Sequence, residues 1–349
     1  MSSLRRANLI NSCCELHMRC IYFCIMFISR FSSAPFLSFS FSFSLLISLS
    51  IVLDGCTKIV DVELPSSDPL LVVEGTIRNG EFPLVLLSKT QGYFDPIGDI
   101  SEGFYLDGAE VTVSANGVPY LLDEICTQDL PPSVLELLGQ SLGIDPLFLS
   151  ENPLCAYTSF DEPGLIGVPG VVYDLHVLYD TLEVTSSSKI QQIVPIDSMA
   201  FAIPSSALTD SMGFITTSYT DPDTIGNCYR WASRRLGEDP SFIYPLGGSV
   251  WDDSFTGNGI PFTFTFFRYS EDFSEEIEGE TGFWITGDTV LVRFESIDRS
   301  AFSAIATFEA AASAQGNPFA PPTNVKTNIE GGLGWWVAYS SSVDTVFCN

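Results

Sequence analysis

Histidine, the side chain most often used as a general base, is scarce in this sequence. The chain of 349 residues has two histidines, and only His176 lies beyond residue 55. A zinc site built from several histidines and the HExxH motif of zinc proteases are therefore excluded. A serine triad would have to use His176, which stands beside Asp174 on the polar face of a predicted strand, and no GxSxG motif occurs. We interpret His176 as a solvated strand residue. P-loop and GxGxxG motifs do not occur either, so nucleotide binding has no support.

Carboxylates could carry two other chemistries. Glycoside hydrolysis needs two carboxyl groups facing each other across roughly 5–9 Å. The visible clusters are Asp252-Asp253 and the acidic run 275–280, but adjacent strand residues point to opposite faces and acidic loops are usually solvated. Asp221 and Asp223 in DPDTIGN offer hard oxygen ligands for calcium without the EF-hand pattern, and ordinary turn chemistry is the favoured interpretation. We expect no enzyme activity, no metal site and no cofactor.

The tryptophans give the best indication of ligand binding. All five stand in the second half of the chain: Trp231, Trp251, Trp284, Trp335 and Trp336. Flat aromatic side chains exposed in a groove stack on sugars and other planar ligands. Trp335 and Trp336 follow the glycine-rich segment 331–334, and since neighbouring strand residues face oppositely, we expect one of them to be buried and the other exposed. Trp335, Trp336 and Trp251 are the candidate ligand-binding residues. Core packing is the commoner alternative.

Four of the nine cysteines precede residue 56 and four follow it. The last four, Cys126, Cys155, Cys228 and Cys348, permit two disulfides in three connectivities. Cys126 and Cys155 flank a segment that begins with two prolines and has the pattern of a short helix at 131–143. A bridge there would close a helical insertion and stabilise the fold by about 3.5 kcal/mol. Cys228 and Cys348 would then pair by exclusion, with free buried thiols as the alternative for both pairs. No CxxC spacing supports metal ligation.

An uncharged stretch at 36–53 would form a helix of roughly 27 Å, close to the thickness of a bilayer core. It ends at Leu53-Asp54-Gly55-Cys56, which resembles the lipobox of bacterial lipoproteins. In that class the cysteine thiol is lipidated, the leader is cleaved before it, and the new amino terminus is acylated. We expect residues 1–55 to be removed, Cys56 to be lipidated and 56–67 to be a linker, with an uncleaved anchor as the alternative. Because an ordinary signal peptide is shorter, we predict translation from Met18 or Met26.

The formal net charge of -28 is unusually acidic, and removal of residues 1–55 would take away four arginines and two acids, leaving -30. Such a field repels nucleic acid and anionic lipid headgroups, so we expect no nucleic-acid partner. Solubility is the favoured explanation of the acidity, and a specific cationic partner is the alternative.

Short strands dominate the chain after the leader. In 171–180 apolar and polar residues alternate, Asn116-Gly117 has the composition of a hairpin turn, and 261–269 is a very apolar strand. The alternation is interrupted near 195–213, while 300–314 has helical spacing. We predict a mainly β protein with two sandwich-like domains: an Ig- or transthyretin-like domain at 68–200 and a larger β domain at 201–349 that contains the helix.

The order of several segments resembles the uncharacterised Bacteroidetes outer-membrane lipoproteins of the domain of unknown function 4249 family. These segments are LLVVEGTIRNG, DGAEVTVSANG, VVYDLHVLYDTLEV, DPDTIGNCYRW and NPFAPPTNVKTNIEGGLGWW. DGAEVTVSANG also resembles the first strands of transthyretin-like sandwiches. The family resemblance implies an envelope lipoprotein often encoded beside TonB-dependent receptors, and it supplies no catalytic residues.

The functional expectation combines these observations. We predict an outer-membrane lipoprotein, anchored by its lipid, that binds a ligand as an accessory to a TonB-dependent transporter. A surface adhesin or glycan-binding module is the first alternative, and a carboxylate-dependent hydrolase is the second.

Overall fold

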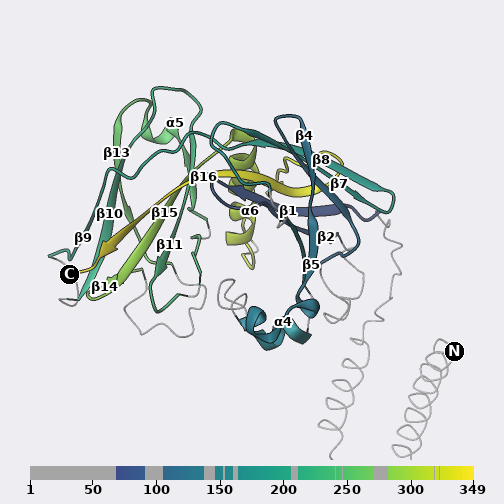
Figure 1. The fold of residues 1–349 in the computed structure, drawn as a ribbon. Coiled ribbons are helices and arrows are strands. Elements are labelled where there is room, and N and C mark those ends of the chain that lie inside the picture. Colours follow the sequence, from purple (N-terminus) through teal and green to yellow (C-terminus); the bar gives the residue numbers. More distant parts are fainter. Residues whose placement is uncertain are drawn as a thin grey trace, which may run out of the picture. The chain divides into compact units, whose positions relative to one another are not determined.

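The computed structural model describes residues 68–90, 105–136, 146–151, 154–159, 164–205, 211–239, 241–245, 247–269, 282–317, 319–321 and 323–349 (Figure 1). The predictions about the leader, the start of translation and Cys56 lie outside these residues, as does the acidic run 275–280. Residues Ser66–Asn349 form one compact unit by their contacts. None of the helices in the described part of the chain has the length and apolar composition needed to cross a bilayer.

Sixteen named strands make the fold mainly β, as the sequence predicts. They are β1 (Leu71–Arg78), β2 (Leu84–Lys89), β3 (Glu110–Ala115), β4 (Val118–Leu121), β5 (Asp123–Cys126), β6 (Cys155–Thr158), β7 (Val172–Tyr179), β8 (Leu182–Lys189), β9 (Ser198–Ala202), β10 (Met212–Thr220), β11 (Cys228–Arg235), β12 (Val250–Asp252), β13 (Pro261–Phe266), β14 (Trp284–Ile285), β15 (Thr289–Ile297) and β16 (Leu333–Phe347). The helices are η2 (Thr127–Asp129), α4 (Pro146–Glu151), α5 (Asp253–Thr256) and α6 (Arg299–Ser313).

The largest sheet has eight strands in the order β12-β11-β15-β16-β1-β2-β6-β5. Its long strand β16 connects the two halves of the chain. The first part of β16 runs parallel to β1, from Val72 opposite Leu333 to Arg78 opposite Tyr339, and the second part runs antiparallel to β15. The two halves that we expected to meet near residue 200 therefore share one sheet.

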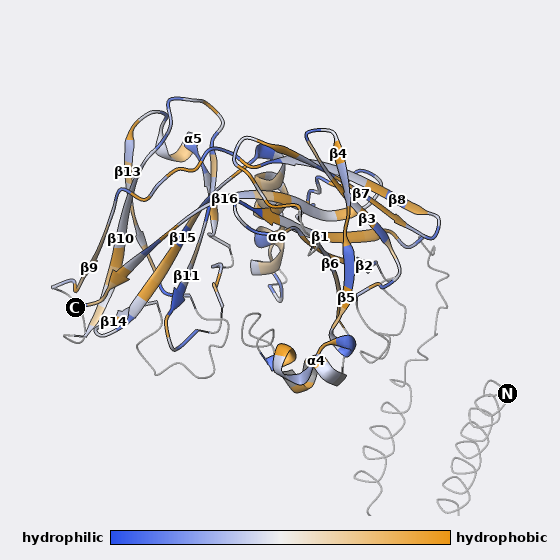
Figure 2. Ribbon diagram, viewed as in Figure 1, coloured by the Kyte–Doolittle hydropathy of each residue, from blue (hydrophilic) through white to orange (hydrophobic). Residues whose placement is uncertain are grey.

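The first sandwich is closed by the four-stranded sheet β4-β3-β7-β8. Alternation along β7 buries Tyr173, Leu175 and Val177, and these pack with residues of β1, β2 and β16 in one hydrophobic cluster. Figure 2 shows hydrophobic residues along these strands, as on strands elsewhere in the fold. Between β3 and β4 the hairpin predicted at Asn116-Gly117 is confirmed, since both residues adopt the positive φ angles of a tight turn.

The second sandwich places β9, β10, β13 and β14 over β11, β15 and the end of β16. Its core is largely aromatic. Tyr219, Tyr229 and Phe294 are buried in mutual ring contact, with centroids 4.6–5.1 Å apart. Trp231 stacks on Phe266 with centroids 3.8 Å apart.

Helix α6 covers the opposite face of the eight-stranded sheet. Alternate residues of β16 divide between the faces: Trp336 and Ala338 enter the first sandwich core, while Val337 and Tyr339 pack with α6. The Asp298 side chain caps the helix by accepting from the Ala301 backbone N–H at 2.9 Å. The helix predicted at 300–314 is confirmed, with its first residue one position earlier.

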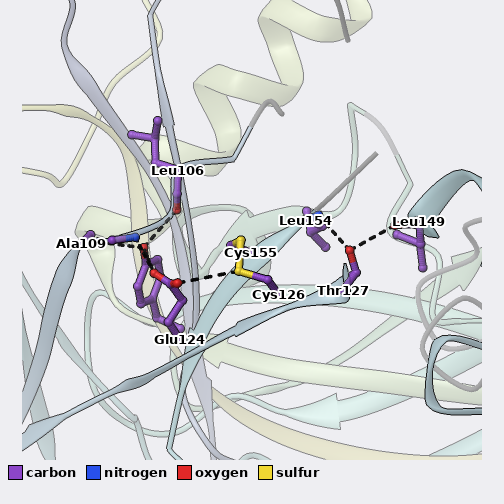
Figure 3. Close-up of a disulfide and its surroundings, with 10 residues drawn as sticks. Leu106, Ala109, Glu124, Cys126, Thr127, Leu149, Leu154 and Cys155 are labelled. Carbon is purple, nitrogen blue, oxygen red and sulfur yellow. Dashed lines mark hydrogen bonds between the residues drawn. A yellow bond between two sulfur atoms is a disulfide. The ribbon is translucent and has the colours of Figure 1, made fainter. Parts of the chain in front are cut away.

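The predicted helical insertion between Cys126 and Cys155 is only partly described. Residues 132–136 are helical and α4 follows at Pro146–Glu151, while 137–145 lie outside the described residues. Cys126 and Cys155 form a disulfide across the antiparallel pair β5-β6 (Figure 3). The bridge predicted from the flanking sequence is thus present. Beside it, the Thr127 hydroxyl donates to the Leu149 carbonyl at 3.1 Å, which ties α4 to the disulfide-linked strands.

Candidate ligand-binding site

The Trp335-Trp336 pair does not form the exposed aromatic surface that we expected. Trp336 is fully buried, its indole N–H donates to the Tyr173 carbonyl at 2.9 Å, and its ring lies against Gly75. Trp335 is half-buried, with its ring 5.0 Å from that of Phe308 on α6. The prediction that one of the pair is buried is confirmed. The expectation that the other is exposed is wrong, because α6 covers that face of β16.

Trp251 lies instead in an open groove, which we call the aromatic groove. Its volume is about 350 Å³, within the range typical of small-molecule sites. The residues that line it are mostly aromatic: Trp231, Trp251, Phe255, Phe262, Phe264, Phe266, Phe267 and Tyr269. Arg268, just after β13, also lines the groove.

The position of the groove follows from the ends of two sheets. Both β12 and β13 pair with only one neighbour among the named strands, β11 and β10 respectively, so each leaves an edge. Because side chains alternate along a strand, the sequence PFTFTF of β13 places its three phenylalanines on one face. The Trp251 ring packs edge-on against Phe264 with centroids 5.0 Å apart, and its indole N–H donates to the Tyr219 hydroxyl at 2.9 Å. Trp251 is therefore fixed in place as one wall.

The rim of the groove is exposed. Phe255 of α5 is 75% accessible to solvent and Phe267 is 60% accessible. Phe255 contacts Phe262 edge-on, with centroids 5.9 Å apart. Two accessible rings next to a buried aromatic wall suit the face of a planar or apolar ligand. The arrangement offers stacking and burial of apolar surface rather than acid–base chemistry.

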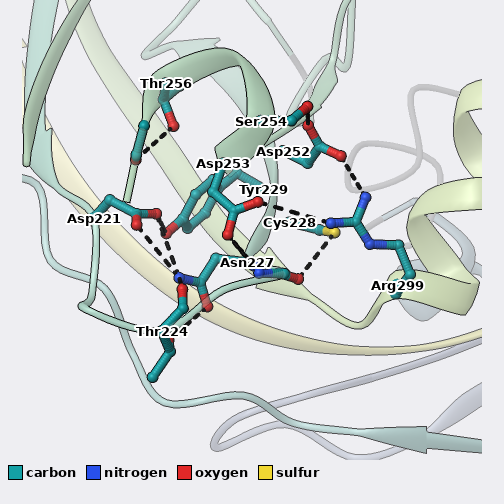
Figure 4. A network of polar contacts seen from close by, with 12 residues as sticks. Asp221, Thr224, Asn227, Cys228, Tyr229, Asp252, Asp253, Ser254, Thr256 and Arg299 are labelled. Atoms are coloured by element: carbon teal, nitrogen blue, oxygen red, sulfur yellow. Dashed lines mark hydrogen bonds and ion pairs between the residues drawn. The ribbon is translucent and has the colours of Figure 1, made fainter. Parts of the chain in front are cut away.

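The DPDTIGN loop forms a separate polar site between β10 and β11 (Figure 4). Asp221 is buried, accepts a hydrogen bond from the Tyr229 hydroxyl, and accepts from the Gly259 backbone N–H at 3.3 Å. Asp223 is exposed and accepts from the Asn258 side chain at 3.2 Å. These contacts make both carboxylates supports of the loop. In the part of the chain that the structure describes, no group of three or more His, Cys, Asp or Glu residues could hold a metal ion.

The neighbouring carboxylates Asp252 and Asp253 are also engaged. Asp253 accepts from the Asn227 backbone N–H at 2.9 Å and lies 3.8 Å from the Arg299 guanidinium. Asp252 forms an ion pair with Arg299 and accepts from Ser254. Burial would raise the pKa of Asp252, but the hydrogen bonds from Ser254 and Arg299 outweigh it and lower the pKa. A general acid needs a raised pKa, so Asp252 does not suit that one role in the hydrolase alternative.

His176 lies where the sequence analysis placed it, on the solvent side of β7. Its Nε2 atom is 2.8 Å from the Glu183 carboxylate of β8, and both side chains are exposed. The interpretation as a solvated strand residue is confirmed.

The family can now be identified. The model of a family described as Domain of unknown function (DUF4249) matches residues 57–345. The chain belongs to the DUF4249 family. A search of curated proteins finds no match.

The two remaining cysteines of this DUF4249 chain correct one prediction. Cys228 and Cys348 are free and buried, so the pairing expected by exclusion does not form. Cys228 packs in the cluster beneath α6, whereas Cys348 packs in the core of the second sandwich. Burial raises the pKa of the Cys228 thiol to about 12 and that of Cys348 to about 11. Both remain protonated at neutral pH, which does not suit a thiolate nucleophile.

Sequence reasoning found Trp251 but missed the phenylalanines of this groove. The sequence predicts 261–269 only as a very apolar strand. Alternation indicates that Phe262, Phe264 and Phe266 share a face, but the open edges that make the face accessible depend on strand pairing across the chain. No sequence pattern indicates the exposure of Phe255, because it lies in α5, a helix of a single turn with no periodicity to read.

Proposed function

We propose that this protein is an exported lipoprotein, anchored at Cys56, that binds an apolar or planar ligand in the aromatic groove as an accessory to a TonB-dependent outer-membrane transporter. The observation that carries the binding role is the groove itself, with Phe255 and Phe267 exposed over a wall built around Trp251. The proposal includes no catalytic step.

Three features support the envelope location. The segment 36–56 has the apolar run and terminal Leu-Asp-Gly-Cys sequence of a lipoprotein leader. The Cys126–Cys155 disulfide fits an oxidising compartment outside the cytosol. The high negative charge keeps the anchored domain soluble and away from anionic headgroups.

The accessory role comes from the family resemblance, and it has a direct test. The intact lipoprotein would be isolated by affinity from gently solubilised outer membranes, and co-purifying proteins would be identified by mass spectrometry. We expect a β-barrel receptor in near-stoichiometric amount. Recovery of the lipoprotein alone would contradict the accessory role while leaving the groove as a binding site. Mass spectrometry of the N-terminal peptide tests the anchor, with a lipidated Cys56 at the amino terminus as the expected species.

A glycan-binding module is the second candidate, because the same aromatic rings can stack on the apolar faces of sugar rings. Binding of defined glycans on an array, with loss of binding in a Phe255→Ser variant, would favour this candidate. In that case no transporter should co-purify.

A further inference from the structure

A second hollow lies away from the aromatic groove, and we call it the seam pocket. Three chain segments line it. They are 191–194 between β8 and β9, 222–229 before and at the start of β11, and 296–299 from the end of β15 to the start of α6. Its volume is about 450 Å³. Segment 191–194 follows the last strand of the first sandwich, and segments 222–229 and 296–299 belong to the second sandwich. The pocket therefore lies where the chain passes from the first sandwich to the second.

The wall formed by the DPDTIGN loop is held rigidly without help from a ligand. The Asp253 carboxylate accepts from the backbone N–H groups of Gly226 and Asn227. The Asn227 side chain donates to the Thr224 carbonyl at 2.6 Å and accepts from the Thr224 hydroxyl at 3.1 Å. Figure 4 shows these groups converging beneath the loop. The pocket is therefore preorganised, which lowers the entropic cost of binding.

The charged groups of the seam pocket are already paired. Asp298 accepts from the Ala301 backbone N–H, the Ser300 hydroxyl and the Ser188 hydroxyl. Arg299 is engaged by Asp252 and lies near Asp253. The lining contains one carboxylate, Asp298, and one guanidinium, Arg299, and because both are already engaged, neither an anionic nor a cationic ligand would find an unpaired counter-charge there. The chemistry of the lining thus favours a neutral ligand.

One polar group in the pocket has no partner. Ser296 is only 5% exposed, lines the pocket, and its hydroxyl has no hydrogen-bond partner among the described residues. A buried hydroxyl without a partner is unfavourable, so a ligand that offered Ser296 a hydrogen bond would remove that cost. Ser340 lies directly opposite on β16, and its buried hydroxyl also has no partner among the described residues. Unlike Ser296, Ser340 is outside the set of residues that line the pocket.

We propose that the seam pocket binds a neutral, hydroxyl-rich small molecule of the saccharide class, with one ligand hydroxyl hydrogen-bonded to Ser296. The Gln192 amide supplies a further donor and acceptor at the rim, and the Thr224 hydroxyl, whose proton is donated to Asn227, supplies a further acceptor. Val194 and Ile225 supply apolar surface for the C–H faces of a sugar ring, and Ile225 is 92% exposed. This site is distinct from the aromatic groove and does not depend on the transporter role.

The test uses the purified full chain and saturation-transfer NMR with glucose, galactose, N-acetylglucosamine, maltose and lactose. Glucuronate and glucosamine serve as the charged counterparts. We expect saturable binding of at least one neutral sugar and about tenfold weaker binding in a Ser296→Ala variant, the effect of losing one hydrogen bond. Ser340→Ala is the matched control and should bind as the wild type does. Because the Ser296 hydroxyl has no partner in the free protein, Ser296→Ala should fold with unchanged or higher thermal stability.

Three results would overturn the proposal. The first is that none of the five neutral sugars shows saturable binding at millimolar concentration, which would mean that the pocket holds only water. The second is that Ser296→Ala binds as tightly as the wild type. The third is that Phe255→Ser, in the aromatic groove, abolishes the same binding, since this would place the sugar in the other site. The pull-down of a receptor is independent of all three results.

Discussion

Neutralising one buried carboxylate, Glu295, should strongly destabilise this protein. Glu295 lies on the α6 side of β15 and is fully buried. It accepts from Arg78 Nε at 3.0 Å, from the Tyr244 hydroxyl at 2.8 Å and from the Ser341 hydroxyl at 2.7 Å. Burial would raise its pKa, but the positive charges led by Arg78 outweigh burial and lower the pKa. The group is therefore ionised at neutral pH.

The magnitude follows from the charge balance of this cluster. Arg78 and Arg230 are nearly buried and are balanced by Glu295 and Glu309, with Arg230 lying 3.8 Å from Glu309. A Glu295→Gln substitution keeps the shape but leaves one buried positive charge without compensation. Removing one partner of a buried ion pair costs about 3–5 kcal/mol. We expect the free energy of unfolding to fall by about that amount.

Urea unfolding at pH 7 measures this difference. The matched control is Glu81→Gln, because Glu81 contacts the same Arg78 at 3.9 Å but is exposed. An exposed ion pair contributes roughly 0–1 kcal/mol, so the control should resemble the wild type. Equal unfolding free energies for Glu295→Gln and Glu81→Gln would contradict this prediction, because the buried cluster would then contribute no more to stability than a surface ion pair does.

Three further predictions concern the acid stability of the protein, its two free thiols and the packing of Gly75. The pKa of Glu295 in the folded protein is depressed below its ordinary value of 4.5. Its contribution to the free energy of unfolding is therefore fully present above pH 4.5 and is lost as the pH falls through the folded pKa. Unfolding measured over a series of acid pH values should show this loss in the wild type and not in Glu295→Gln. Cys228 and Cys348 should resist a thiol reagent in the native protein and should both react after denaturation without reductant, whereas failure of both to react would indicate a bridge between them. Gly75→Ala should lower stability by about 1–3 kcal/mol in urea unfolding, because its Cβ would lie 2.6 Å from the Trp336 ring, and an unchanged midpoint would argue against this packing.

Local patterns in the sequence predicted local structure well. Alternation in 171–180 predicted β7, and Asn116-Gly117 predicted the turn between β3 and β4. The spacing of 300–314 predicted α6. The Cys126–Cys155 disulfide was predictable because both cysteines flank one short insertion. Each of these features is determined by residues close together in the chain.

Features that depend on distant residues were not predictable. β1 and β16 come from opposite ends of the described chain, and their parallel pairing has no signature in either strand alone. That pairing joins the halves through one sheet and brings β16 beneath α6, which covers Trp335. The separation of Cys228 from Cys348 and the unpartnered hydroxyl of Ser296 depend on the same long-range arrangement.

We propose that the aromatic groove is an open binding site, and binding of a neutral fluorescent probe tests this proposal. N-phenylnaphthylamine is planar and apolar, and it avoids the repulsion that an anionic dye would meet from a chain of net charge -28. We predict saturable one-site binding that is weakened at least about tenfold by the double substitution Phe255→Ser and Phe267→Ser, as expected from the loss of two apolar contacts. Phe347→Ser, which removes a ring that is 62% exposed outside the groove, should leave the affinity unchanged. Equal affinity in the groove variant and the Phe347 variant would contradict the assignment of the aromatic groove as the binding site.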